Sequence, residues 1–134
     1  MAVNVMKDSI DIGLVTGNIE AMTTFYRDTL GLPQEAILDM PGGTAMTRLI
    51  CGTTIVKLLS HSQTPEAANP PGGISGATGI RYFTITVDNL EEITKACEVA
   101  GYKVAVSPRE IRPGIRISMI EDPDGNWVEL LQPS

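Results

Sequence analysis

Four polar residues stand at matched points of a pattern that occurs twice in the chain. They are Asp11, Lys57, Tyr82 and Glu129. Glu129 or Lys57 could act as a general acid or base, and Tyr82 could donate a hydrogen bond to a developing oxyanion. A protonated Lys57 could also balance the charge of nearby carboxylates. We therefore predict that Glu129, Lys57 and Tyr82 are the candidate catalytic residues.

Side-chain alternation predicts where these four residues lie. Successive side chains of a strand point to opposite faces of the sheet. On the first strand of the first half, the residues expected to meet a helix are Ile10, Ile12 and Leu14. Asp11 then faces away from the helix, and the same logic places Leu59, Trp127 and Leu131 on helix-free faces. A polar cluster with apolar walls suits a small-molecule site, so these four residues are predicted to contact a ligand. The alternative is an exposed sheet face with ordinary polar residues.

The two halves of the chain repeat one order of elements. "IDIGLVTGNIEAMTTFY" (10–26) and "IRYFTITVDNLEEITKA" (80–96) both read as an alternating strand, an Asn and an amphipathic helix. "IVKLL" (55–59) and "WVELL" (127–131) match at the far ends of the halves. Each half therefore predicts a βαβββ module, and the fold class is α+β with an open curved sheet.

The expected elements follow from periodicity and from turn residues. In the first half they are a strand at 10–15, a helix capped by Asn18 that runs to Leu30, and strands near 34–40, 44–51 and 53–60. In the second half they are a strand at 82–87, a helix capped by Asp88 or Asn89 that ends at Gly101, and strands near 102–107, 114–120 and 126–132. "DPDGN" (122–126) predicts a tight turn. The Pro- and Gly-rich residues 63–78 predict a linker between modules at 1–62 and 79–134, within one compact domain.

Composition narrows the class of protein. The chain has 134 residues, of which 43% are hydrophobic and 19% charged, and its net charge is -6. This acidic balance argues against binding to nucleic acid or to an anionic membrane. No apolar run is long enough to span a bilayer, and "MAVNVMKDS" lacks a secretion signal. Cys51 and Cys97 are expected to be reduced packing residues, and we expect a cytoplasmic protein. His61 is expected at the surface or in a cap.

Two segments carry a resemblance to a known superfamily. With the paired βαβββ halves, "IGLVTGNIEAMTTFYRDTLGL" (12–32) and "EDPDGNWVELLQP" (121–133) resemble the vicinal oxygen chelate superfamily. That superfamily includes glyoxalase I, bleomycin-resistance proteins, fosfomycin-resistance enzymes, methylmalonyl-CoA epimerase and extradiol dioxygenases. The resemblance implies two modules packed into an open barrel. It also implies a homodimer with clefts built from both chains.

The resemblance further implies that metal ligands come from the first and last strands of each module. Those positions hold Asp11, Lys57, Tyr82 and Glu129, and only Glu129 keeps a usual ligand type. Tyrosine is a poor ligand unless ionised, and lysine must lose its proton to coordinate a metal. We therefore predict no cofactor, with the Lys57 ammonium in the place of the metal and paired with Asp11 and Glu129. If a divalent metal is present, Asp11 and Glu129 are its expected ligands.

Three classes of function remain open. The first is a metal-free small-molecule-binding protein, of the drug-sequestering or resistance type. The second is a metal-free lyase or isomerase. The alternative is a metal-dependent lyase, epimerase or dioxygenase with unusual ligands, of which the iron dioxygenase ranks lowest because His61 is the only histidine. Four arginines could hold a carboxylate or phosphate, or be solvated edge charges: Arg48, Arg81, Arg112 and Arg116.

Overall fold

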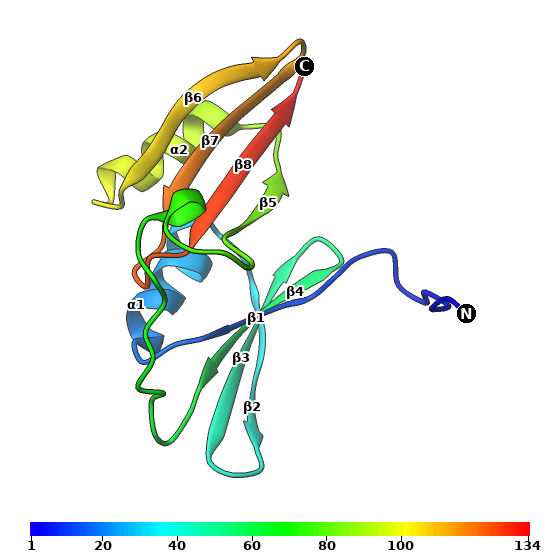
Figure 1. The fold of residues 1–134 in the computed structure, drawn as a ribbon, viewed down its shortest axis with the longest axis vertical. Coiled ribbons are helices and arrows are strands. Elements are labelled where there is room, and N and C mark those ends of the chain that lie inside the picture. Colours follow the sequence, from blue (N-terminus) through cyan, green and yellow to red (C-terminus); the bar gives the residue numbers. More distant parts are fainter. The chain divides into compact units, whose positions relative to one another are not determined.

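The computed structural model describes all 134 residues, and they form two compact units, 1–66 and 67–134. Each unit contains a four-stranded sheet and a helical connection after its first strand (Figure 1). The α+β class with two βαβββ units, expected from the repeat, is confirmed. No helix is long and apolar enough to cross a membrane.

The first unit follows the expected element order. Its elements are β1 (Ile12–Val15), α1 (Ile19–Thr23), η1 (Thr24–Thr29), β2 (Gln34–Met40), β3 (Thr44–Cys51) and β4 (Thr54–Ser60). The sheet order is β1-β4-β3-β2, with β1 parallel to β4 and the other pairs antiparallel. The helical segment packs against β4. The fully or almost fully buried core side chains of this unit are Met22, Phe25, Tyr26, Leu49, Val56 and Leu58.

The helix of the first unit is not uniform. It begins as a short α-helix and continues as the π-helix η1, in which the Leu30 N–H donates to the Phe25 carbonyl at 2.9 Å. This wider turn lets the neighbouring residues Phe25 and Tyr26 both be fully buried, with their rings edge to face at 4.7 Å. The expectation of one regular helix to Leu30 assumed 3.6 residues per turn throughout, and it is wrong in that detail.

Two other local expectations in the first unit are also wrong. Ile10 lies before β1 and is 82% exposed, so it does not meet the helix. The Asn18 side chain makes no cap hydrogen bond, and its N–H instead donates to Thr16 Oγ1 at 2.8 Å. The alternation itself holds within β1, where Ile12 and Leu14 are half-buried and Gly13 and Val15 are exposed.

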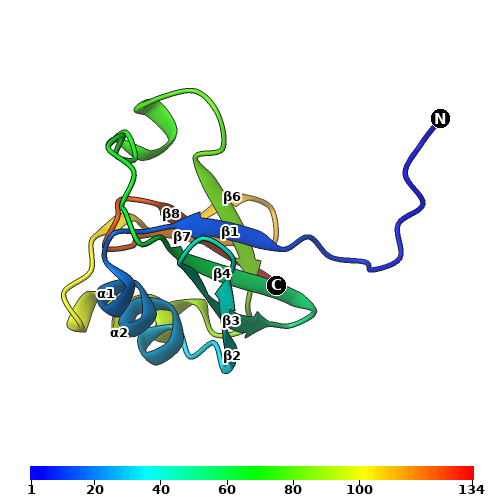
Figure 2. The ribbon, with the colours of Figure 1, turned by 90° about the horizontal axis from the view of Figure 1, so that it is seen from below.

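The second unit repeats the plan. Its elements are the short 3₁₀ helix η2 (Gly73–Ser75), β5 (Tyr82–Thr86), α2 (Leu90–Val99), β6 (Val104–Arg112), β7 (Ile115–Glu121) and β8 (Trp127–Pro133). The sheet order is β5-β8-β7-β6, with β5 parallel to β8. The helix α2 covers one face of this sheet and contacts β6, β7 and β8 (Figures 1 and 2).

The helix α2 is fastened to its sheet by buried polar and apolar contacts. Leu90 and Cys97 are fully buried, and the hydroxyls of Thr94 and Ser118 are 2.8 Å apart in the interior. Burial raises the pKa of the Cys97 thiol to about 11, which agrees with its expected packing role. The N–H of Leu90, the first helical residue, donates to Gln132 Oε1 at 2.8 Å, and the N-cap residue Asn89 makes no side-chain cap bond. Of the two residues expected as the cap, Asp88 and Asn89, the structure places Asn89 at the N-cap position, but without the expected side-chain hydrogen bond.

The last strands differ from expectation mainly in length. The strand expected at 102–107 extends to Arg112, with register shifts between Val106 and Arg109 around Pro108. Proline is tolerated there because β6 is an edge strand and the ladder is already interrupted. The expected "DPDGN" turn is confirmed, since Asp122 Oδ1 accepts the N–H groups of Asp124 and Asn126, each at 2.9 Å.

Candidate functional site

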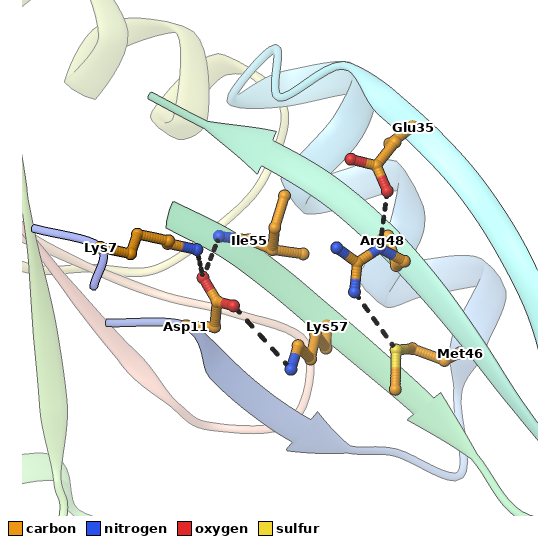
Figure 3. Close-up of polar contacts among 7 residues, drawn as sticks. All are labelled: Lys7, Asp11, Glu35, Met46, Arg48, Ile55 and Lys57. Atoms are coloured by element: carbon orange, nitrogen blue, oxygen red, sulfur yellow. Dashed lines mark hydrogen bonds and ion pairs between the residues drawn. The ribbon is translucent and has the colours of Figure 1, made fainter. Parts of the chain in front are cut away.

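The helix-free face of the first unit carries a row of charged side chains. Lys57 on β4 lies opposite Gly13 of β1 and opposite Arg48 of β3. Asp11 precedes Gly13 by two residues, so its side chain projects to the side of Lys57. Glu35 lies at a register shift of β2 and reaches Arg48. The row therefore reads Asp11, Lys57, Arg48, Glu35 across the four strands (Figure 3).

Asp11 is the most heavily bonded carboxylate of this face. Its Oδ1 accepts hydrogen bonds from Lys7 Nζ at 2.6 Å and from the Ile55 N–H at 2.8 Å. The hydrogen bond from Lys7, followed by that from Ile55, lowers the pKa of Asp11 below its ordinary value. Asp11 therefore stays ionised, and it joins the start of β1 to β4.

Lys57 is less engaged than Asp11. Its Nζ lies 3.9 Å from Asp11 Oδ2, which makes an ion pair but not a hydrogen bond. Its side chain is 31% exposed, so the ammonium keeps access to solvent or to a ligand. The pairing of Lys57 with Glu129 stays a prediction.

Arg48 stands beside Lys57. The sequence had placed it among four arginines that could hold a carboxylate or phosphate or be solvated edge charges, but had not paired it with Lys57. Its Nε donates to Glu35 Oε1 at 2.6 Å, and its Nη1 lies 4.0 Å from Met46 Sδ (Figure 3). Alternation along β3 could indicate that Arg48 lies on the helix-free face. Its position opposite Lys57 follows only from the register of β3 and β4. Leu59, a predicted ligand contact, lies next to Val15 and Met46 in the same register.

The helix-free face of the second unit has different chemistry. Tyr82 lies opposite Trp127, Thr84 opposite Glu129 and Thr86 opposite Leu131. Three of the predicted residues, Trp127, Glu129 and Leu131, therefore lie on β8, and Tyr82 lies on the neighbouring strand β5. Tyr82 is 44% exposed.

Thr84 is a site residue that the sequence reasoning missed. Its Oγ1 donates to Glu129 Oε1 at 2.7 Å and thereby orients the carboxylate. The signal was present, because Thr84 follows Tyr82 by two residues and so lies on the same face. Only the register shows that Thr84, rather than Tyr82, is the direct neighbour of Glu129.

The indole ring of Trp127 makes a hydrogen bond at its edge and is covered on one face. Its Nε1 donates to Glu121 Oε1 at 3.0 Å. A Cβ built on Gly73 would lie 2.1 Å from the Trp127 ring, so the backbone of Gly73 packs directly on the indole. Trp127 therefore has one face covered by its own unit.

The residues that cover Trp127 form what we call the glycine strap, residues 69–76. Arg81 donates to the carbonyl oxygens of Gly73 at 2.6 Å and Pro70 at 2.8 Å. Asn69 Nδ2 donates to the carbonyl of Asp124 at 3.2 Å. Composition alone predicted a linker here. The bonds from Arg81 and the bond from Asn69 to Asp124 instead hold the strap within the second unit.

Neither unit by itself offers a donor set that suits a divalent metal. No group of three or more His, Cys, Asp or Glu side chains is placed to hold an ion. One oxygen of Asp11 already accepts two hydrogen bonds, and the adjacent Lys57 would repel a cation. Glu129 accepts a hydrogen bond from the Thr84 hydroxyl, and no imidazole of its own unit lies beside it to serve as a second metal ligand.

The chain belongs to the Glyoxalase/Bleomycin resistance protein/Dioxygenase superfamily, whose sequence model matches residues 9–130. This match confirms the superfamily resemblance carried by the two repeated halves. No curated protein sequence matches the chain.

Solved structures share the fold at low sequence identity. A glyoxalase family protein from Bacillus cereus is 16% identical, with a TM-score of 0.82 over 99% of this chain and 98% of that one. TnmS3, an antibiotic binding protein from a Streptomyces species, is 21% identical, with a TM-score of 0.70 over 100% and 99% of the two chains. A lactoylglutathione lyase from Agrobacterium tumefaciens is 27% identical, with a TM-score of 0.65 and 92% of each chain covered.

Proposed function

We propose that this protein binds a small organic molecule without the help of a metal ion. The observation that carries the proposal is the partly exposed side chain of Lys57, set in the middle of a helix-free sheet face. The Asp11 carboxylate beside it already accepts two hydrogen bonds within the unit. Lys57 is thus not required to satisfy Asp11 and can act as a fixed positive charge for a ligand.

The resemblance to an antibiotic binding protein supports a binding role. TnmS3 covers the whole length of this chain, and its name describes binding rather than turnover. The apolar surroundings of the charged row, including Leu59 and Met46, are of the kind that hold the body of an organic ligand. In the second unit, Trp127 and Leu131 would serve in the same way.

A metal-free lyase or isomerase is the second candidate, and the geometry of Glu129 favours it. Thr84 fixes one carboxylate oxygen of Glu129, while the other has no hydrogen bond within the unit. An oriented carboxylate with a free oxygen can accept or return a proton, with Tyr82 of the neighbouring strand donating to an oxyanion. The lactoylglutathione lyase among the structural relatives makes lactoylglutathione a reasonable trial substrate.

A ligand screen with a parallel turnover assay tests this proposal. The metal-free protein is mixed with a panel of small organic molecules, including aromatic antibiotics, and its thermal midpoint is measured. We expect saturable stabilisation by some members, because a ligand that binds only the folded state raises the midpoint. Lactoylglutathione is incubated with the same sample and its conversion followed; turnover abolished by Glu129→Gln would favour the enzyme. Failure of every molecule to stabilise the protein or to be converted would refute a small-molecule function.

A further inference from the structure

Two like charges stand side by side at the centre of the first unit's helix-free face. Arg48 and Lys57 are directly opposite in the antiparallel register of β3 and β4. Their side chains are 24% and 31% exposed, so solvent screens them only in part. Like charges directly opposite on a sheet are destabilising. The arrangement therefore costs stability, which the ion pairs of Arg48 with Glu35 and of Lys57 with Asp11 offset.

The acids at the two ends of the row leave donors of the central pair unused. Asp11 reaches Lys57 only at 3.9 Å, and Lys7 is its closer partner. Glu35 engages the Nε of Arg48, and no oxygen of the unit accepts from the Arg48 Nη atoms. The Lys57 ammonium and the Arg48 Nη atoms are consequently the donors that a ligand would meet first (Figure 3).

Charge counting indicates which anion would fit. The four side chains of the row balance, with two cations and two carboxylates, and Lys7 beside Asp11 adds a third cation. These five side chains together carry a surplus of one positive charge. This surplus stands out in a chain whose net charge is -6. A singly charged anion neutralises it, whereas a doubly charged phosphate would overshoot. A planar carboxylate also matches the fork of an arginine.

We infer that the Arg48–Lys57 pair is an anion subsite that selects ligands bearing a carboxylate. This inference rests on the proposed small-molecule function and names its ligand class. The row supplies charge-assisted hydrogen bonds to the carboxylate, and the neighbouring Met46 and Leu59 contact the apolar part of the ligand. Binding relieves the repulsion between the two cations, so the unliganded protein is expected to gain stability when either one is neutralised.

Three matched probes test the inference by NMR titration of the ¹⁵N-labelled full chain. All three probes have a phenyl ring. Benzoate adds a carboxylate with one negative charge, phenyl phosphate adds a group with a larger negative charge, and benzamide adds an uncharged amide. We expect saturable shifts centred on β3 and β4 with benzoate, and weaker binding of the other two. Arg48→Gln and Lys57→Gln should each weaken benzoate binding about tenfold or more, as loss of one charge-assisted hydrogen bond predicts.

Controls with the same change of net charge exclude general electrostatics. Arg27→Gln and Lys95→Gln each remove one cation that is paired elsewhere, with Asp28 and with Glu98, and should leave benzoate affinity unchanged. Amide spectra of each variant show directly that it is folded. Tighter binding of phenyl phosphate, or equal effects of the controls, would overturn the carboxylate subsite. Saturable binding of benzamide alone would also overturn the carboxylate subsite, but it would leave the small-molecule function intact. If neither a probe nor any screened compound binds, both the subsite and the small-molecule function are refuted.

Discussion

The carboxylate of Asp11 is stabilised as an anion by two donors from different parts of the first unit. Lys7 precedes it by four residues, and the Ile55 N–H comes from the neighbouring strand β4. Both bonds favour the ionised form, which is why the pKa of Asp11 is lowered. A group with a lowered folded pKa stabilises the fold above its unfolded pKa. That contribution is lost as the pH falls through the folded pKa.

This arrangement predicts a measurable titration. In an NMR titration below about pH 5, the Asp11 carboxyl carbon should titrate below the usual aspartate value of about 3.9, and the Ile55 amide proton should report the same midpoint. Lys7→Gln should raise that midpoint because it removes the largest cause of the shift. Lys95→Gln, a charge change in the other unit, should not. An ordinary midpoint in the parent, or no response to Lys7→Gln, would contradict the described contacts.

At the scale of elements, the glycine strap explains why three of its positions carry glycine. Gly72 and Gly73 have φ values of 97° and 55°, which residues with a side chain rarely adopt. A Cβ at Gly76 would lie 1.8 Å from the Pro71 carbonyl oxygen. The strap can therefore follow this path over Trp127 only without side chains at these points.

Gly73→Ala is expected to displace the strap from Trp127. Gly79→Ala is the matched control, since Gly79 also has a positive φ, of 100°, but an added Cβ there meets nothing within 4 Å. We expect Gly73→Ala to lower the free energy of unfolding by about 1–3 kcal/mol more than Gly79→Ala, the usual cost of overpacking. Trp127 is the only tryptophan, so its fluorescence should shift to the red in Gly73→Ala alone. Indistinguishable spectra and stabilities for the two variants would show that the strap does not pack on the indole.

Local patterns predicted most of the elements, and the misses have physical causes. Strands such as β2 and β3 were predicted at their observed bounds because alternation and glycine turns are local signals. The Gln132 cap of α2 and the bond from Asn69 of the strap to Asp124 depend on partners 42 and 55 residues away. The π-helix depends on the packing of Phe25 and Tyr26, which periodicity does not describe. The same division applies to the site. Alternation assigned Asp11 and Lys57 to one face, but only the strand register identified Arg48 as the neighbour of Lys57.

For the whole molecule, we propose a homodimer, as the superfamily resemblance implies. Sedimentation velocity at micromolar concentration is expected to give about twice the mass of the 14.3 kDa chain. The sequence also predicted the superfamily, which the match over residues 9–130 confirms. A single species with the mass of one chain would remove the dimer proposal and leave the fold untouched.

The central claim is that this member of the superfamily works without a metal, with Lys57 as its fixed positive charge. Elemental analysis of protein purified without chelator tests it most directly. We predict well under one equivalent of zinc, nickel, manganese or iron per chain. The thermal midpoint should also not rise when these ions are added, since binding to the folded state would raise it. Stoichiometric metal in the parent that is lost in Glu129→Gln or Asp11→Asn would contradict the claim and favour a metal-dependent enzyme.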